Sequence, residues 1–93
     1  MIRFKILLSK TAASQLGKLE NETRERIKTC LKNLEVDPFL RRSGADIKRL
    51  FTIEEPPLYR LRVGDYRVIY FVVNDDVKIT EIIHRSKGYK WLE

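Results

Sequence analysis

Residues 59–70 read YRLRVGDYRVIY, and this stretch decides the fold. Its two halves alternate in character and are rich in Val, Ile and Tyr, which favours two β-strands. Gly64-Asp65 lies between them and suits a two-residue β-turn. The stretch therefore predicts a tight hairpin in which Val63 pairs with Tyr66.

The predicted pairing divides the hairpin into two chemically different faces, because directly paired residues share one face of a sheet. The apolar face carries Leu61, Val63, Val68 and Tyr70. The basic face carries Arg60, Arg62 and Arg67. Three guanidiniums in one small patch repel each other, so this face predicts the binding of an anion.

Composition limits the possibilities. The chain has 93 residues, 43% of them hydrophobic, so residues 1–93 are expected to form one domain with a small core. Nothing approaches 18 consecutive apolar residues, so no membrane span is expected. The single cysteine, Cys30, excludes an intramolecular disulfide and fits a reducing cytoplasm. The net charge of +6 favours a polyanionic partner.

The rest of the chain supplies two helices and further strands. One helix is expected after a cap at Ser9 or Thr11, and a longer one runs from a cap at Asn21 to Asp37-Pro38. Strands are expected over residues 2–8, 46–53, 58–63, 66–73 and 77–84. We predict an α+β fold of order β-α-α-β-β-β. Two N-terminal helices should pack on one face of a small twisted antiparallel sheet and leave the other face solvated.

The last hairpin turns at Asn74-Asp75 or at Asp75-Asp76. Either tip is expected to place His84 on the face of Arg67 and to leave Glu81 on the helix face. Val72, Ile79 and Ile83 are expected on the core face, and Lys78, Thr80 and Ile82 on the face of Arg67. The candidate site then comprises Arg60, Arg62, Arg67 and His84, with Arg85 and Tyr89 just beyond the strand end.

This set of side chains suits phosphoryl chemistry. Guanidiniums hold phosphate and stabilise the charge that grows in a transition state, while His and Tyr exchange protons. Aromatic rings also stack on unpaired RNA bases. The sequence shows no dense Asp/Glu cluster on this face and no Cys/His metal spacing, so we expect no metal and no cofactor.

The whole chain resembles the RelE/ParE toxin superfamily, and within it the RelE-like toxins. The resemblance rests on four segments: Leu34-Glu35-Val36-Asp37-Pro38, Ile47-Lys48-Arg49-Leu50, residues 59–70, and Ile82 to Tyr89. It implies a RelE-like toxin of a type II toxin–antitoxin system, which cleaves mRNA on the ribosome in the cytoplasm. It also implies a hetero-oligomer with a cognate antitoxin, RelB-like and acidic to match the +6 charge.

The resemblance also implies roles for residues. Basic residues that orient the mRNA correspond to Lys48, Arg60, Arg62 and Lys87. Arg67 would stabilise the phosphate, and Arg85 and Tyr89 would assist. The implied reaction is attack by a ribose 2′-hydroxyl on its own 3′-phosphate. Either Tyr89 or His84 would be the general acid.

Two other functions remain open from the sequence. The ParE branch shares the fold but acts on DNA gyrase by protein contact, without cleaving RNA. A non-catalytic RNA-binding domain would also explain the basic face. Cleavage of mRNA at the ribosomal A site distinguishes the nuclease from both alternatives.

Overall fold

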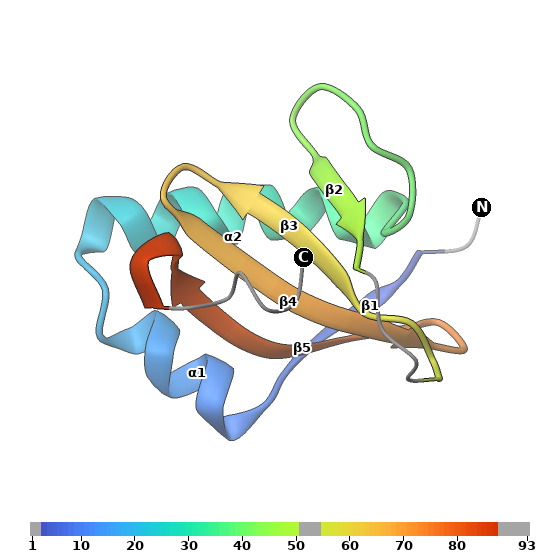
Figure 1. Ribbon diagram of the computed structural model, residues 1–93, viewed down its shortest axis with the longest axis horizontal. Helices are drawn as coiled ribbons and strands as arrows, with labels where there is room; N and C mark the ends of the chain where they lie inside the picture. The colour runs from blue at the N-terminus through green and yellow to red at the C-terminus, as the bar shows by residue number, and fades with distance from the viewer. Residues whose placement is uncertain (1–2, 51–54, 88–93) are drawn as a thin grey trace.

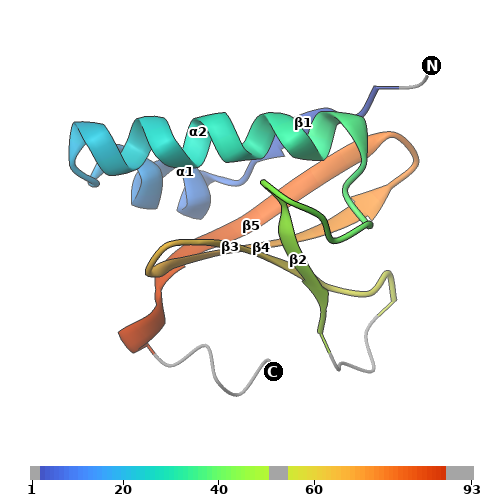
Figure 2. The same ribbon diagram turned by 90° about the horizontal axis from the view of Figure 1, so that it is seen from above.

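The computed structural model describes residues 3–50 and 55–87 and shows one five-stranded sheet in the order β1-β5-β4-β3-β2 (Figure 1). The elements are β1 (Lys5–Leu8), α1 (Lys10–Gly17), α2 (Asn21–Val36), β2 (Asp46–Arg49), β3 (Tyr59–Val63), β4 (Tyr66–Val73), β5 (Asp76–His84) and the short 3₁₀ helix η1 (Arg85–Lys87). Both helices lie on the same side of the sheet (Figure 2). The predicted α+β fold is confirmed.

Two details of the predicted topology differ from the structure. Four strands follow the helices, as the expected ranges 46–53, 58–63, 66–73 and 77–84 had it, whereas the predicted order β-α-α-β-β-β was one strand short; the short β2 pairs with β3 along its whole length. The sheet is mixed rather than antiparallel, because β1 runs parallel to β5, with Lys5 opposite Asp76. The α-helical segment between β1 and the remaining strands makes this parallel return possible.

The helix boundaries follow their capping chemistry. Ser9 is the N-cap of α1, as predicted, and its Oγ accepts a hydrogen bond from the Ala12 N–H at 3.0 Å. Asn21 is the first residue of α2 rather than its cap, and Glu20 precedes it. The helix ends at Val36, as the predicted stop at Asp37-Pro38 requires.

Asp37 and Arg42 organise the chain where it leaves α2. The Asp37 carboxylate accepts backbone hydrogen bonds from Phe39, at 2.8 Å, and Leu40, and these bonds lower the pKa of Asp37. The guanidinium of Arg42 donates to the carbonyl of Asn33 at 2.7 Å and to that of Asp37 at 3.0 Å. Arg42 therefore satisfies carbonyls at the end of the helix.

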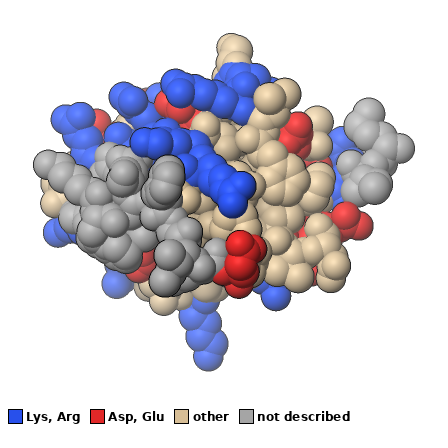
Figure 3. Space-filling model, turned by 45° about the vertical axis from the view of Figure 1, so that its right-hand side comes forward, with Lys and Arg blue, Asp and Glu red and all other residues tan. Residues whose placement is uncertain are grey.

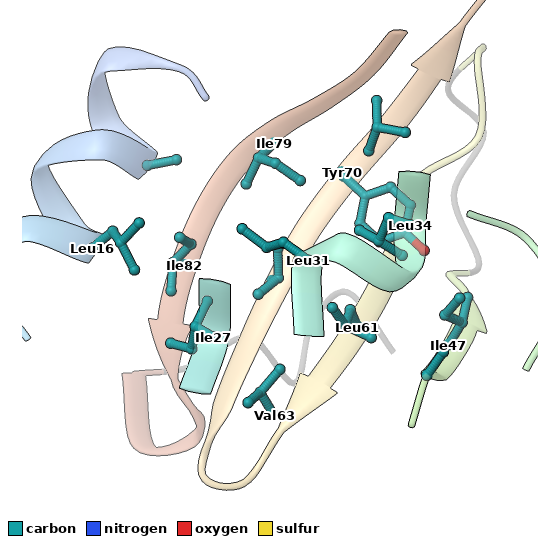
Figure 4. Packing of buried hydrophobic residues seen from close by; sticks show 14 residues of the cluster. Leu16, Ile27, Leu31, Leu34, Ile47, Leu61, Val63, Tyr70, Ile79 and Ile82 are labelled. Carbon is teal, nitrogen blue, oxygen red and sulfur yellow. The ribbon is translucent and has the colours of Figure 1, made fainter. Parts of the chain in front are cut away.

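The main core lies between the helices and the sheet (Figure 4). Its buried side chains come from both α-helices and from every strand but β1, and they include Leu16, Ile27, Leu31, Leu34, Ile47, Leu61, Val63, Tyr70, Ile79 and Ile82. Tyr70 is fully buried, and its hydroxyl donates to the Pro38 carbonyl at 2.7 Å. Burial raises the pKa of Tyr70, because the ionised phenolate would lose its hydration.

The predicted register of the β3–β4 hairpin is confirmed. Val63 lies opposite Tyr66, and Arg62 lies opposite Arg67. Gly64 has a φ of +58° at the first central position of the turn, where a type II′ turn places glycine. Glycine is needed here because other residues are strained at this φ.

Replacing Gly64 with alanine is therefore expected to destabilise the chain by about 1–2 kcal/mol. The new Cβ would also lie 3.0 Å from the Arg26 Nη1 atom, a flexible group that can move. Gly17→Ala is the matched control, since Gly17 is helical and has open space around its Cβ position. It should be neutral or stabilise by up to about 1 kcal/mol. Urea denaturation measures the stability of both variants. Equal midpoints for Gly64→Ala and Gly17→Ala would show that the turn does not require glycine at position 64.

The β4–β5 hairpin departs from its predicted geometry. Its tip is Asn74-Asp75, one of the two expected turns, with Val73 opposite Asp76. Further along, Ile69 pairs with Glu81 while Tyr70 pairs with Ile79. Thr80 is therefore an extra residue, and the strand contains a β-bulge there.

The bulge exchanges the two faces for the rest of β5. The expected faces of Glu81, Ile82, Ile83 and His84 were therefore wrong. Ile82 enters the helix-side core, and Ile83 joins a separate cluster on the other face. Glu81 lies on the face of Arg67, and His84 lies opposite Tyr66 on the helix side.

Polar groups from α1 stabilise the bulged strand. The Ser9 hydroxyl donates to the Thr80 carbonyl at 2.8 Å, and the Gln15 side chain accepts from the Ile82 N–H at 2.6 Å. The Thr80 hydroxyl donates to the Ile69 carbonyl at 3.2 Å. Within residues 3–50 and 55–87, no helix is long and apolar enough to cross a membrane.

Candidate functional site

The candidate site lies on the sheet face that the helices leave uncovered, which we call the outer face (Figure 2). Strand pairing arranges its side chains in rows that run across β2, β3, β4 and β5. The turn row contains Asp46, Arg62, Arg67 and Ile83. The middle row contains Lys48, Arg60, Ile69 and Glu81. The predicted grouping of Arg60, Arg62 and Arg67 on one face is thus confirmed.

The outer face is less solvated than expected. Arg67 is only 5% exposed and Arg60 only 7%, whereas Arg62 and Lys48 are exposed. A second hydrophobic cluster explains part of this burial. It consists of Leu50 and Ile69, with Leu58 and Ile83 packed against them.

Arg67 is fixed at the hairpin turn. Its Nη1 atom donates to the carbonyl of Gly64 at 2.9 Å and to that of Tyr66 at 3.1 Å. These two bonds hold the plane of the guanidinium in one orientation beside the turn. A group held in this way keeps its orientation when a ligand binds, which is the condition for electrostatic preorganisation.

Arg60 is held by a carboxylate from another strand. The Oδ1 atom of Asp46 lies 3.6 Å from Arg60 Nη2 and 3.5 Å from Arg41 Nη2. Asp46 therefore bridges a buried arginine of the middle row and an exposed arginine of the loop before β2. This ion pair offsets part of the positive charge of the face.

Arg85 reaches the same turn as Arg67. Its backbone N–H donates to the Asp65 carbonyl at 2.8 Å, and its Nε atom lies 3.5 Å from Asp65 Oδ1. Its side chain is largely exposed, as is Lys87 in the same 3₁₀ helix. The structure therefore brings Arg62, Arg67 and Arg85 together at the β3–β4 turn.

His84 does not share the outer face with these arginines. Its ring packs edge to face against Tyr66, with the ring centroids 5.2 Å apart. Its Nδ1 atom lies 2.8 Å from the Ser86 hydroxyl oxygen and accepts from the Ser86 N–H at 3.2 Å. Tyr89, the other predicted proton donor, lies outside the described residues.

An oblique view of the molecule shows that its charged side chains are unevenly distributed (Figure 3). Lys and Arg side chains gather in the upper part of that view, beside a largely uncharged area. Two carboxylates that were not expected on the outer face, Asp46 and Glu81, lie in its rows. Among residues 3–50 and 55–87, no three His, Cys, Asp or Glu side chains group closely enough to hold a metal ion.

Sequence reasoning missed the two carboxylates of the outer face, Asp46 and Glu81. Asp46 could have been found, because it lies at the start of the strand predicted over 46–53, and pairing that strand with the one over 58–63 places it opposite Arg62. Glu81 could not be found from alternation alone, because the bulge at Thr80 reverses its face.

The fold and the gathered arginines define a small, basic α+β domain with one anion-attracting sheet face. Residues 6–89 match the family described as the ParE toxin of type II toxin–antitoxin system, parDE. The chain also resembles two proteins of Methanocaldococcus jannaschii. Toxin RelE3 is 29% identical and putative toxin RelE1 is 31% identical, and the alignments cover 94% and 96% of this chain and 97% and 98% of those proteins.

A solved structure agrees with these sequence matches. The archaeal RelE–RelB complex from Pyrococcus horikoshii contains a chain that superimposes with a TM-score of 0.77 at 28% identity. The alignment covers 94% of this chain and all of that chain. This chain therefore belongs to the RelE/ParE superfamily of type II toxins, as the sequence motifs predicted.

Proposed function

We propose that this chain is a RelE-like mRNA endonuclease that acts on the ribosome. The observation that carries the proposal is the convergence of Arg62, Arg67 and Arg85 at one hairpin turn. Guanidiniums at this turn can hold a phosphodiester and stabilise the additional negative charge of its transition state. Residues 1–93 form one toxin domain in this proposal.

The proposed reaction is attack by a ribose 2′-hydroxyl on the adjacent 3′-phosphate, in which the O2′–P bond forms, the bond from phosphorus to the 5′-oxygen breaks, and the hydroxyl proton passes to solvent or to a group of the ribosome. Arg67 stabilises the phosphate, Arg85 assists it, and Lys48, Arg60, Arg62 and Lys87 bind the RNA strand. The leaving 5′-oxygen receives a proton from Tyr89 or from His84. Because His84 lies on the helix side in this structure, Tyr89 is the preferred donor.

Primer extension on ribosomes loaded with a defined mRNA tests this function. We expect cuts within the codon in the ribosomal A site, and no cuts in the same mRNA without ribosomes. Intact mRNA on toxin-treated ribosomes would contradict nuclease activity. Equal cutting of free and bound mRNA would contradict dependence on the ribosome.

Arg62 is expected to contribute binding more than chemistry, because it is exposed and lies one strand away from Arg67. Arg62→Ala should weaken association with ribosomes and lower the slope of log affinity against log salt by roughly 1. Single-turnover cleavage on saturating ribosomes should fall much less than for Arg67→Ala. Equal losses in that assay would show that the two arginines do not divide these roles.

We also propose an acidic, RelB-like antitoxin as the partner of this chain in the cytoplasm. The net charge of +6 favours a negatively charged partner. The similar chain from Pyrococcus horikoshii was solved in a RelE–RelB complex. The two proteins would form a hetero-oligomer that blocks the outer face. A neighbouring reading frame that encodes a short acidic protein would support this pairing.

Inhibition of DNA gyrase by protein contact is the second candidate function. The matching family carries the ParE description, and Arg60 and Arg67 are buried and hold structural contacts that need no RNA. A supercoiling assay with purified gyrase tests it. Inhibition of supercoiling together with intact ribosomal mRNA would favour this candidate.

A further inference from the structure

A hollow lies on the outer face next to the cationic rows. Its volume is about 450 Å³, within the range of sites that hold small molecules. Its described lining consists of Glu55, Pro56, Leu58, Phe71, Thr80 and Glu81. These residues come from β4, β5 and the segment before β3.

The lining combines apolar walls with carboxylates. Leu58, Pro56 and the ring of Phe71 supply flat, apolar surface. Glu55 and Glu81 supply acceptor oxygens, and the Thr80 hydroxyl donates to the Ile69 carbonyl. The charged side chains of this lining are therefore acceptors, and a ligand with an apolar face and hydrogen-bond donors complements it.

The β-bulge puts Glu81 in this hollow. Without the extra residue at Thr80, Glu81 would point to the helix side, as simple alternation predicts. Bulges often direct a side chain toward a functional site. Here the bulge moves a carboxylate from the helix side to the one face of the sheet where arginines gather.

The distance from the hollow to the arginines of the turn row suits a nucleotide that spans the two. Glu81 lies one row beyond the Arg67–Ile83 pair, which corresponds to about 7 Å along the strands. Phe71 is four residues from Arg67 on the same face, about 13 Å away. The base of a nucleotide next to a phosphate held at the turn can therefore reach the hollow.

We propose that this hollow binds a guanine base of the single-stranded RNA substrate, with Glu81 accepting its N1–H and N2–H groups. The proposal rests on the proposed function and gives it a base preference. Guanine is the base whose Watson–Crick edge presents two adjacent donors, which match the two oxygens of one carboxylate. Uracil has one donor between two carbonyl oxygens, which a carboxylate repels. Phe71 stacks on the base.

The neighbouring charges favour a nucleotide over a cationic protein side chain. An arginine from a protein partner has a similar pair of donors. However, Arg60 and Lys48, two and three strands away from Glu81 in the same row, add no attraction for that arginine. The same two cations attract the phosphates on either side of a bound base.

Fluorescence anisotropy with non-cleavable RNA tests the inference on the full chain. The probes are two labelled 2′-O-methyl hexamers of uridine that carry either one guanosine or one inosine at the same position. Inosine lacks the N2 amino group and loses one of the two bonds to Glu81. We expect wild-type protein to bind the guanosine hexamer about tenfold more tightly.

Glu81→Gln should reduce this preference to less than about twofold, since the amide offers only one acceptor oxygen. Glu22→Gln is the matched control, because it makes the same charge change on an exposed position of α2 and should keep the preference. Circular dichroism checks the fold of both variants. Equal affinity of the wild type for the two hexamers, or a preference that survives in Glu81→Gln, overturns the proposal.

Cleavage on ribosomes separates this inference from the proposed function. A chain that cuts ribosomal mRNA but does not distinguish guanosine from inosine keeps the nuclease proposal and loses the guanine site. A chain that shows the Glu81-dependent preference but does not cut has the base site without the nuclease activity. Glu81-dependent binding of an arginine-rich peptide, with no guanine preference, would assign the hollow to a protein partner and overturn the proposal.

Discussion

Arg67→Ala is expected to lower the single-turnover rate of mRNA cleavage on ribosomes about 10²–10³-fold, which is the typical loss when one donor to a developing negative charge is removed. The guanidinium of Arg67 is held by the Gly64 and Tyr66 carbonyls, so its orientation is fixed before substrate binds. Its position next to Arg62, at the turn that Arg85 also contacts, makes it the central cation of the proposed site.

The structural contacts of Arg67 require a stability control. Loss of its bonds to the turn should cost about 1–2 kcal/mol of stability, which urea denaturation measures separately from the rate. Arg3→Ala removes the same charge from an exposed ion pair with Glu35 and should leave both stability and rate nearly unchanged. Arg67→Lys keeps the charge but loses the planar fork, so an intermediate rate is expected. A folded Arg67→Ala variant with wild-type cleavage would remove Arg67 from the mechanism.

The β3–β4 hairpin was predictable because residues close together in the sequence determine its turn and its register. Gly64 supplies the positive φ that the turn needs, and the register follows from the turn length. The grouping of Arg60, Arg62 and Arg67 then follows from alternation alone. The predicted helices were equally local, apart from a shift of one residue at the start of α2.

The geometry of β5 was not predictable from alternation, because the bulge depends on tertiary contacts. Thr80 and Ile82 bond to Ser9 and Gln15, which belong to the distant start of the chain. A one-residue insertion reverses every later side chain, so His84 and Glu81 exchanged faces relative to the expectation.

The burial of the outer face could have been inferred from the composition of β4, although not from its alternation. β4 reads YRVIYFVV and is apolar at most positions on both faces, which is typical of a central strand covered on two sides. Ile69 accordingly packs in a second cluster with Leu50. The burial of Arg60 depends in addition on Asp46 from β2, a contact between strands that only the assembled sheet reveals.

A substrate with 2′-deoxyribose on the 5′ side of the cut is expected to resist cleavage entirely, because the proposed nucleophile is that 2′-hydroxyl. The alternative is water activated by a metal ion, which needs carboxylates close together. Asp46 on β2 and Glu81 on β5 lie in different rows and are separated by three strand spacings, about 14 Å. Asp46 is also paired with Arg41 and Arg60. The two carboxylates of these rows therefore cannot share one Mg²⁺ ion. Glu55 and Glu81 line the same hollow, but among the described residues no third His, Cys, Asp or Glu joins them closely enough to hold a metal ion. The guanidiniums are left to stabilise the charge.

The cut ends give an independent readout of the same chemistry. Attack by the neighbouring hydroxyl leaves a 2′,3′-cyclic phosphate and a 5′-hydroxyl, which end-specific ligation or mass spectrometry identifies. A deoxyribose placed one nucleotide away is the matched control and should be cut at the normal rate. Chelation of Mg²⁺ is not a usable test, because ribosomes need that ion for their own integrity. A 5′-phosphate product, or efficient cutting of the deoxy substrate, would assign the attack to water and contradict a mechanism based on Arg67 and the ribose hydroxyl.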